Sequence, residues 1–361
     1  GCRRARVGGL ACSAAAGSVG VGDVAMMTGT NRGRRRLVGA GLCASLMPGL
    51  GDTANVQPAA GPFDPDSWLS RAQAAAVSLS YQGTFTFSGG GMVSSSKVAH
   101  FRDARHRYER IEVLDGQPRR QFRLDDEVLT LWLQSKVAVV ESDDVVPEFP
   151  ALPSGSQRWQ ESYDVRWVGQ DRVAGQEADV VVAKPRDGQR FAQRLWAERS
   201  TGLLLRADLL GAKGDLLESS AFTEVMLGVR IAAETVTGPM RRLEGYKVLR
   251  SLSRKVVLES EGWSMVRTPA GFQRVSCMRK SLHDPVGGGD PREVLQVVFS
   301  DGLTHVSVFV EAFDAGRHRP MRTNLGATHT SMSRQGDAWL TIVGDVPMTT
   351  IAQFESGFQR R

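Results

Sequence analysis

The alternation of apolar and polar residues toward the C-terminal end of the chain predicts a β-hairpin. In "QVVFSDGLTHVSVFVEAF", residues 296–313, apolar side chains occupy every second position from Val306 to Val310. A period of two places one set of side chains on one face of a strand. Asp301-Gly302 predicts a two-residue turn, because turns of the primed type need positive φ at both central residues. The stretch holds little that could catalyse a reaction, so the purpose of this sheet is the first question that the sequence raises.

The chain up to residue 236 reads as one helix followed by many strands. In residues 63–80, Trp68, Leu69, Ala72 and Ala76 recur at helical spacing and predict one amphipathic helix. The period then changes to two, as in "SYQGTFTFSGG", and about ten strand-like segments follow. Short turns between them favour an antiparallel sheet. A single sheet of this size must curl, and a helix over its open side would cover the apolar face.

Two segments interrupt the strand pattern. Residues 143–162 form a long connection, and connections of that length are more often functional than idle. Residues 237–261 are basic and begin beside a Gly-Pro pair, which indicates an interdomain linker with a short strand at Lys255 to Glu259. The fold prediction is therefore α+β, with a curved antiparallel half-barrel and its helical cover at residues 61–236 and a smaller α+β domain at residues 262–361.

An arginine-rich segment before an apolar run predicts an export signal near the N-terminus. The apolar run, residues 37–50, follows Arg34 to Arg36 and precedes small and polar residues. It is shorter than the roughly 20 residues that span a bilayer and contains glycine and proline, which favours a cleaved signal at residues 27–60 over a permanent anchor. Residues 1–26 then read as an upstream extension. The signal predicts export from the cytoplasm, and the Sec and twin-arginine routes both stay open.

The net charge of +6 stops suggesting nucleic-acid binding once the charges are located. Residues 1–60 carry seven arginines and two aspartates. The remaining 301 residues carry 38 basic and 37 acidic side chains, so that part of the chain is nearly neutral. A protein that binds a phosphate backbone is expected to show a basic surface. We therefore expect no nucleic-acid partner.

The sequence lacks the common motifs of catalysis and metal binding. Its six histidines do not pair at metal-ligand spacing, and Cys277 is the single cysteine after residue 60. Neither a G-x-S-x-G elbow nor a phosphate-binding Walker loop occurs. The adjacent acids Asp125-Asp126 lie beside a predicted turn, whereas acid–base carboxylates usually converge from separate strands. We expect no enzyme activity, no metal and no cofactor.

Large apolar side chains on separate strands are candidates for a lipid pocket in the curved sheet. Burial is worth about 0.8 kcal/mol per CH₂, so a chain of about twelve methylenes could gain on the order of 10 kcal/mol before ordering costs. The alternative is that the same side chains simply fill the core. The candidates are Tyr81, Phe85, Phe87, Leu131, Trp132, Trp196 and Leu205.

The sequence also resembles a known family. The strings "YQGTFTF", "VGQDRVAGQEADVVV" and "RLWAERSTGLLLRADLL", followed by "PAGFQRV", "FSDGLTHVSVFVE" and "IVGDVP", resemble in order and spacing the MucB/RseB family of periplasmic regulators. The resemblance runs from about residue 63 to the C-terminus. It implies a first domain shaped like the lipoprotein carriers LolA and LolB, joined to a smaller second domain.

The resemblance further implies a function without catalysis. A family member would bind the periplasmic domain of an anti-sigma factor, shield it from the site-1 protease and keep an envelope-stress sigma factor sequestered. Lipopolysaccharide or mislocalised lipoprotein would release this hold. The family's second-domain signature matches at the hairpin, which makes Phe299, Asp301, Phe309 and Glu311 candidates for partner contact. The signature is equally explained by folding.

Two other functions stay open at this level. A periplasmic lipid or lipoprotein carrier needs only the half-barrel, and about 100 further residues argue for a second partner. An uncharacterised hydrolase requires a Ser, a His and a carboxylate to converge in the fold. The oligomeric state, including a homo-oligomer, is also left open by the sequence.

Overall fold

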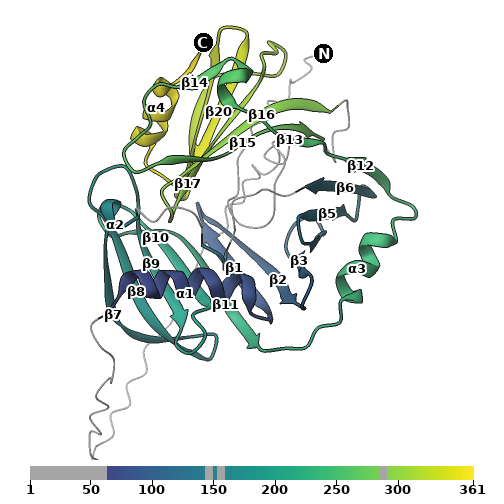
Figure 1. The fold of residues 1–361 in the computed structure, drawn as a ribbon, viewed down its shortest axis with the longest axis vertical. Helices are drawn as coiled ribbons and strands as arrows, with labels where there is room; N and C mark the ends of the chain where they lie inside the picture. Colours follow the sequence, from purple (N-terminus) through teal and green to yellow (C-terminus); the bar gives the residue numbers. More distant parts are fainter. Residues whose placement is uncertain (1–62, 143–148, 153–158, 284–290) are drawn as a thin grey trace, which may run out of the picture.

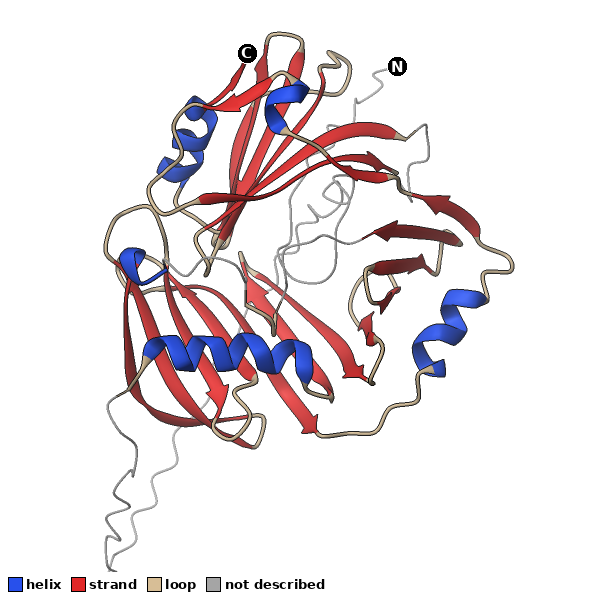
Figure 2. Ribbon diagram, in the orientation of Figure 1, coloured by secondary structure: helices blue, strands red, loops and turns tan. Residues whose placement is uncertain are grey.

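A curved sheet with a smaller sheet above it makes up most of the molecule (Figures 1 and 2). The computed structural model describes residues 63–142, 149–152, 159–283 and 291–361. The predicted export signal and upstream extension lie outside these residues. In the part of the chain that is described, no helix is both long and apolar enough to cross a membrane.

The larger sheet has twelve strands in the order β12-β6-β5-β4-β3-β2-β1-β11-β10-β9-β8-β7. Neighbouring strands are antiparallel, except that β12 runs parallel to β6. Figure 1 shows the sheet curving from β7 on one side to β12 on the other. The strands are β1 (Tyr81–Gly89), β2 (Met92–Arg102), β3 (Arg107–Val113), β4 (Arg119–Leu124), β5 (Glu127–Trp132), β6 (Val137–Ser142), β7 (Tyr163–Val173), β8 (Gln176–Pro185), β9 (Ala192–Glu198), β10 (Leu204–Leu210), β11 (Leu216–Leu227) and β12 (Lys247–Arg250).

Helix α1 (Pro65–Ser78) confirms the predicted leading helix. It begins at Asp64, whose side chain accepts a hydrogen bond from the Asp66 amide at 3.1 Å and so satisfies one of the free donors of the first turn. Its buried residues Trp68, Leu69 and Ala72 pack against β8, β9 and β10. The helix crosses one half of the sheet in Figure 1 and covers apolar positions there.

The other half of the sheet is covered by a second helix. Helix α3 (Glu234–Arg241) buries Val236 against Phe101, Tyr108 and Phe122 of β2, β3 and β4. In the connection between β6 and β7, the short helix α2 (Trp159–Ser162) and Phe149 pack onto the sheet. The Phe149 ring lies 5.4–5.6 Å, centroid to centroid, from the rings of Phe85 and Phe222.

The smaller sheet has seven strands in the order β13-β15-β16-β17-β20-β19-β18. Its core is closed by helix α4 (Met348–Gly357), which buries Ile351 and Phe354 against Val306 and Val308. The separate strand pair β14 (Trp263–Met265) and β21 (Phe358–Arg360) and the 3₁₀ helix η1 (Leu258–Glu261) complete this domain. The strands of the seven-stranded sheet are β13 (Ser253–Lys255), β15 (Gln273–Leu282), β16 (Arg292–Ser300), β17 (His305–Ala312), β18 (Met321–Leu325), β19 (Thr328–Gln335) and β20 (Ala338–Gly344).

The architecture confirms the predicted α+β fold class, with a curved antiparallel sheet followed by a smaller α+β unit. The segment from residue 237 to 261 differs from the expected linker, because β12 pairs with β6 and β13 pairs with β15. The strand expected at Lys255 to Glu259 instead ends at Lys255, and η1 follows it. The connection is therefore hydrogen-bonded into both sheets.

The predicted hairpin is present as β16 and β17, but its turn is shifted by one residue. The Asp301 amide donates to the Thr304 carbonyl at 3.3 Å, so Gly302 and Leu303 form the tip in place of Asp301 and Gly302. Gly302 has a φ of 98°, a conformation that glycine adopts without strain. Asp301 therefore lies one residue before the tip, and its side chain makes contacts outside the second domain.

Candidate functional site at the junction of the two sheets

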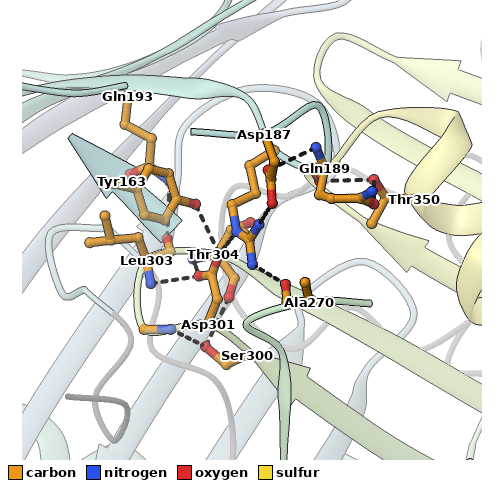
Figure 3. Close-up of polar contacts among 12 residues, drawn as sticks. Tyr163, Asp187, Gln189, Gln193, Ala270, Ser300, Asp301, Leu303, Thr304 and Thr350 are labelled. Atoms are coloured by element: carbon orange, nitrogen blue, oxygen red, sulfur yellow. Dashed lines mark hydrogen bonds and ion pairs between the residues drawn. The ribbon is translucent and has the colours of Figure 1, made fainter. Parts of the chain in front are cut away.

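The tip of the β16–β17 hairpin inserts into the first domain. Leu303 is 5% exposed and packs in the same cluster as Trp68 of α1 and Leu195 of β9. Its carbonyl accepts a hydrogen bond from the Gln193 side-chain amide at 3.1 Å (Figure 3). The hairpin is thus shared between the two domains, with its strands in one core and its tip in the other.

A buried ion pair fixes the hairpin tip. The side chains of Arg190, from the β8–β9 loop, and Asp301 are both fully buried and form an ion pair through Arg190 Nε and Asp301 Oδ2. Arg190 also donates to Asp187 Oδ2 at 2.7 Å and to the Ala270 carbonyl at 2.5 Å. Its guanidinium lies over the Phe272 ring, 4.8 Å from the centroid. One side chain therefore ties the β8–β9 loop to two segments of the second domain.

Hydrogen bonds accompany the ion pair at the buried Asp301 carboxylate. Its Oδ2 accepts from the Tyr163 hydroxyl at 3.0 Å, and its Oδ1 accepts from the amides of Leu303 and Thr304, each at 2.9 Å (Figure 3). A buried charge is tolerated when it is paired and hydrogen-bonded, whereas loss of one partner costs about 3–5 kcal/mol. The carboxylate thus organises its own turn and anchors it to the first domain.

The electrostatics of the junction follow from this pairing. Burial raises the pKa of Tyr163 well above its usual value, and the nearby Asp301 carboxylate adds to the effect. Burial alone would lower the pKa of Arg190, but Asp301 outweighs it and holds the pKa above its usual value. Tyr163 therefore stays a neutral hydrogen-bond donor, and Arg190 stays a cation, across the pH range in which proteins are usually folded.

A second contact joins the two sheets away from the hairpin tip. Glu218 of β11 accepts a hydrogen bond from the Ala327 amide, in the β18–β19 turn, at 2.9 Å. Beside the ion pair, the Thr350 hydroxyl of α4 donates to the Gln189 carbonyl at 2.8 Å. The domains therefore contact each other through several separate polar points in addition to Leu303.

The seven residues predicted to line a lipid pocket are all buried, with exposures of 6% or less, but they do not gather in one place. Tyr81, Phe85, Trp196 and Leu205 share one cluster, to which Phe149 also contributes. Leu131 packs with α3, and Trp132 lies in a third cluster beside Leu249 of β12. Phe87 is buried near Gly89 at the end of β1. Adjacent residues of one strand face opposite sides, which separates Leu131 from Trp132.

The described residues form a small apolar hollow beneath α1 and the hairpin tip. It has an interior of about 10 Å³, on the order of one water molecule, which is far too small for an acyl chain. The residues lining it come from α1, α2, β7, β8, β9 and the hairpin tip: Pro65, Trp68, Leu69, Trp159, Val165, Val181, Ala183, Leu195 and Leu303. An acyl chain therefore does not fit in this hollow as it stands.

The four residues predicted to contact a partner have different surroundings. Phe299 is 1% exposed and packs against Phe354 in the core of the second domain. Asp301 is buried at the junction with Arg190. Phe309 and Glu311 are partly exposed and lie on the face of β17 opposite its core residues. Glu311 accepts a hydrogen bond from Arg292 at 3.0 Å.

The arrangement is suited to holding surfaces together. Among the described residues, no three His, Cys, Asp or Glu side chains lie together as metal ligands would. Reasoning from the sequence missed Arg190, Tyr163 and Glu218 as junction residues. Arg190 lies in "RDGQR", whose Asp-Gly pair is typical of a turn, but nothing in the sequence marks a partner 111 positions away.

Comparisons with known proteins agree with this two-domain architecture. The family model of the MucB/RseB N-terminal domain matches residues 64–240, and that of the MucB/RseB C-terminal domain matches residues 257–359. The sigma factor AlgU regulatory protein MucB of Pseudomonas aeruginosa is 32% identical over 85% of this chain and 94% of its own length. The sigma-E factor regulatory protein RseB of Escherichia coli K12 is 26% identical over 82% of this chain and 89% of its own length.

Solved structures show the same likeness. The crystal structure of MucB in complex with MucA(peri) is 26% identical, covers 82% of this chain and 99% of the solved one, and superposes with a TM-score of 0.61. The crystal structure of MucB alone is 25% identical, covers 83% and 100%, and gives a TM-score of 0.62. The agreement spans both domains and the connection between them, and the chain therefore belongs to the MucB/RseB family.

Proposed function

We propose that this protein is a non-enzymatic periplasmic regulator that binds the periplasmic domain of an anti-sigma factor and shields it from regulated proteolysis. The observation that carries the proposal is the likeness across both domains to MucB, which is solved in complex with MucA(peri). Relatives named as sigma-factor regulators cover nearly the same part of the chain. The absence of catalytic motifs from the sequence is consistent with regulation by binding.

The face of the second sheet opposite its core supplies a candidate contact surface. Phe309 is a partly exposed aromatic residue at the centre of this sheet, where it pairs with Gln296 of β16 and Thr341 of β20. Aromatic anchors at the centre of an interface carry much of the binding energy. We expect Phe309 to contact the anti-sigma segment, with Glu311 beside it as a polar neighbour.

Lipid sensing is the finer part of the proposal. The hollow beneath α1 does not hold an acyl chain in this arrangement. A lipid that bound at this hollow would favour a different arrangement of the covering segments, such as one in which Phe149 leaves the cluster around Phe85. A ligand shifts an equilibrium only when its affinity differs between the two states. Lipid and partner would oppose each other for that reason.

A binding experiment with a lipid arm tests the proposal. The periplasmic domain of the cognate anti-sigma factor is immobilised, and retention of the full mature protein is measured with and without purified lipopolysaccharide. We expect retention that lipopolysaccharide abolishes. Unchanged retention on addition of lipopolysaccharide would contradict the lipid switch, and mislocalised lipoproteins in a strain lacking the protein would favour a carrier instead.

Single substitutions in the same assay test the contact surface. We expect Phe309→Ala to weaken binding about tenfold or more, because it removes a central aromatic contact. Val275→Ala is the matched control, since Val275 is an apolar residue of the same domain that is 47% exposed on β15. Equal affinities of the two variants would place the partner elsewhere.

A further inference from the structure

Glu218 of the first domain is buried against a turn of the second. Its side chain is 5% exposed, and its Oε1 accepts hydrogen bonds from the amides of Ala327 at 2.9 Å and Thr328 at 3.4 Å. A Cβ atom on Gly326 of the same turn would overlap with the Glu218 carboxyl. The carboxyl group therefore packs closely against the β18–β19 turn. Its burial and hydrogen bonds would be lost if the two sheets separated.

A second carboxyl group shares a hydroxyl with Glu218. Thr328 Oγ1 lies 2.7 Å from Asp345 Oδ1 and 3.4 Å from Glu218 Oε1. A hydroxyl has one hydrogen and can donate it to only one of the two carboxylates. A proton on Glu218 relieves this conflict, because the neutral acid keeps Oε1 as an acceptor for the two amides, competes less for the hydroxyl hydrogen and no longer repels Asp345.

The charged and titratable groups around this contact come from three elements of the second domain. Asp345 follows β20, His305 begins β17, and the ring of His329 on β19 lies 3.1 Å from the Ala327 carbonyl through its Nδ1. On its own sheet, Glu218 pairs with Gly89 of β1 and Leu209 of β10, which carry no charge. Asp301 lies further along the junction and is neutralised by Arg190.

We propose that Glu218 is a proton-controlled latch between the two domains, which closes with the uptake of one proton on its carboxyl group and loosens when that group ionises. The latch goes beyond the proposed function, since it concerns the contact between domains whatever partner they hold. The stability of the contact between the two sheets would then depend on the pH of the compartment.

The sign of the pH dependence follows from the pKa values. Burial, and then the neighbouring Asp345, raises the pKa of Glu218 from 4.5 to about 8. When the sheets separate and water reaches the group, its pKa falls back toward 4.5. Below about pH 4.5, the equilibrium constant for contact between the two sheets therefore does not depend on Glu218. As the pH rises from 4.5 toward 8, this constant falls about tenfold per pH unit, and above that value it no longer changes.

A histidine would give the opposite sign. Burial lowers the pKa of His305, and Asp345 and Asp301 only partly oppose this effect. If His305 controlled the contact, closure would weaken on acidification, because the buried ring would have to take up a charge. The direction of the response therefore distinguishes the two groups.

Amide hydrogen exchange tests the latch in the full mature protein. The amides of Ala327 and Thr328 are hydrogen-bonded to Glu218, so their protection factors report the opening equilibrium at this point. Between pH 5 and pH 8 we expect these protection factors to fall about tenfold per pH unit. In Glu218→Gln, which keeps an acceptor and cannot ionise, we expect them to be independent of pH.

Two further variants keep the test decisive. Glu224→Gln is the matched control, since Glu224 is an exposed residue of the same strand, and it should behave like the wild type. Asp345→Asn removes the repulsion, so the fall in protection should end at a lower pH. Protection that does not change with pH in the wild type, or a response that persists in Glu218→Gln, would overturn the latch; loss of protection on acidification would assign the response to His305.

Discussion

Asp301 connects three parts of the molecule through one carboxylate. It closes its own turn through the amides of Leu303 and Thr304, receives the Tyr163 hydroxyl from β7, and pairs with Arg190 from the β8–β9 loop. The hairpin was predictable from the sequence, because an Asp before a Gly between two β-rich runs marks one, but the turn was placed one residue too early. Tyr163 and Arg190 could not be predicted as its partners, because each lies more than 100 positions away in the chain and is placed by how the sheets meet.

Gly271 tests how closely the junction is packed at the level of one residue. It has a φ of +80°, and a Cβ atom there would overlap with Arg190 and Ser162. We expect Gly271→Ala to lower the free energy of unfolding by about 1 kcal/mol for the backbone and a further 1–3 kcal/mol for the overlap. Urea denaturation measures the sum of the two contributions.

Gly245→Ala separates the two contributions. Gly245 has a φ of +81° and no atom within 4 Å of the added Cβ, so it carries the backbone cost alone. Equal losses in the two variants would mean that the neighbourhood of Arg190 is loosely packed and would contradict the geometry described for the junction.

At the scale of elements, regular alternation was predictable and pairing was not. A period of two in "YQGTFTF" and in the β17 segment correctly marked β1 and β17, because the side chains of each alternate between a core and the opposite face. The segment carrying β12 was interpreted as a linker, because it is basic and begins beside a Gly-Pro pair. The four residues of β12 are mostly exposed and show no apolar period. Its assignment depends on β6, a parallel partner more than 100 residues earlier in the chain.

The hairpin formed by β16 and β17 is expected to hold the domains together through its tip. Leu303→Ala would leave a cavity among Trp68, Leu195 and their neighbours, at a cost of about 2–5 kcal/mol in the free energy of unfolding. Leu252→Ala is the matched control, because Leu252 is 76% exposed and its truncation should change stability by no more than about 0.5 kcal/mol. A small and equal effect of both variants would show that the tip does not carry the contact.

At the scale of the whole molecule, the sequence predicted apolar positions but could not tell a filled core from a cavity. The seven proposed lipid residues are all buried, and Phe149, which arrives from the long connection, fills space beside Phe85 and Phe222. The periodicity of a strand predicts which side chains are buried. It does not predict which other segment covers them, so the size of a pocket could not be predicted from the sequence.

The same scale carries the functional claim. The two sheets are joined by a shared hairpin, by a buried ion pair and by a connection that pairs with both of them. Relatives with this architecture are named as sigma-factor regulators. The most direct test is a calorimetric titration of the mature protein with the periplasmic domain of its cognate anti-sigma factor. We predict saturable binding with a fixed stoichiometry. A titration without binding heat, with no complex in size-exclusion chromatography of the same mixture, would contradict it.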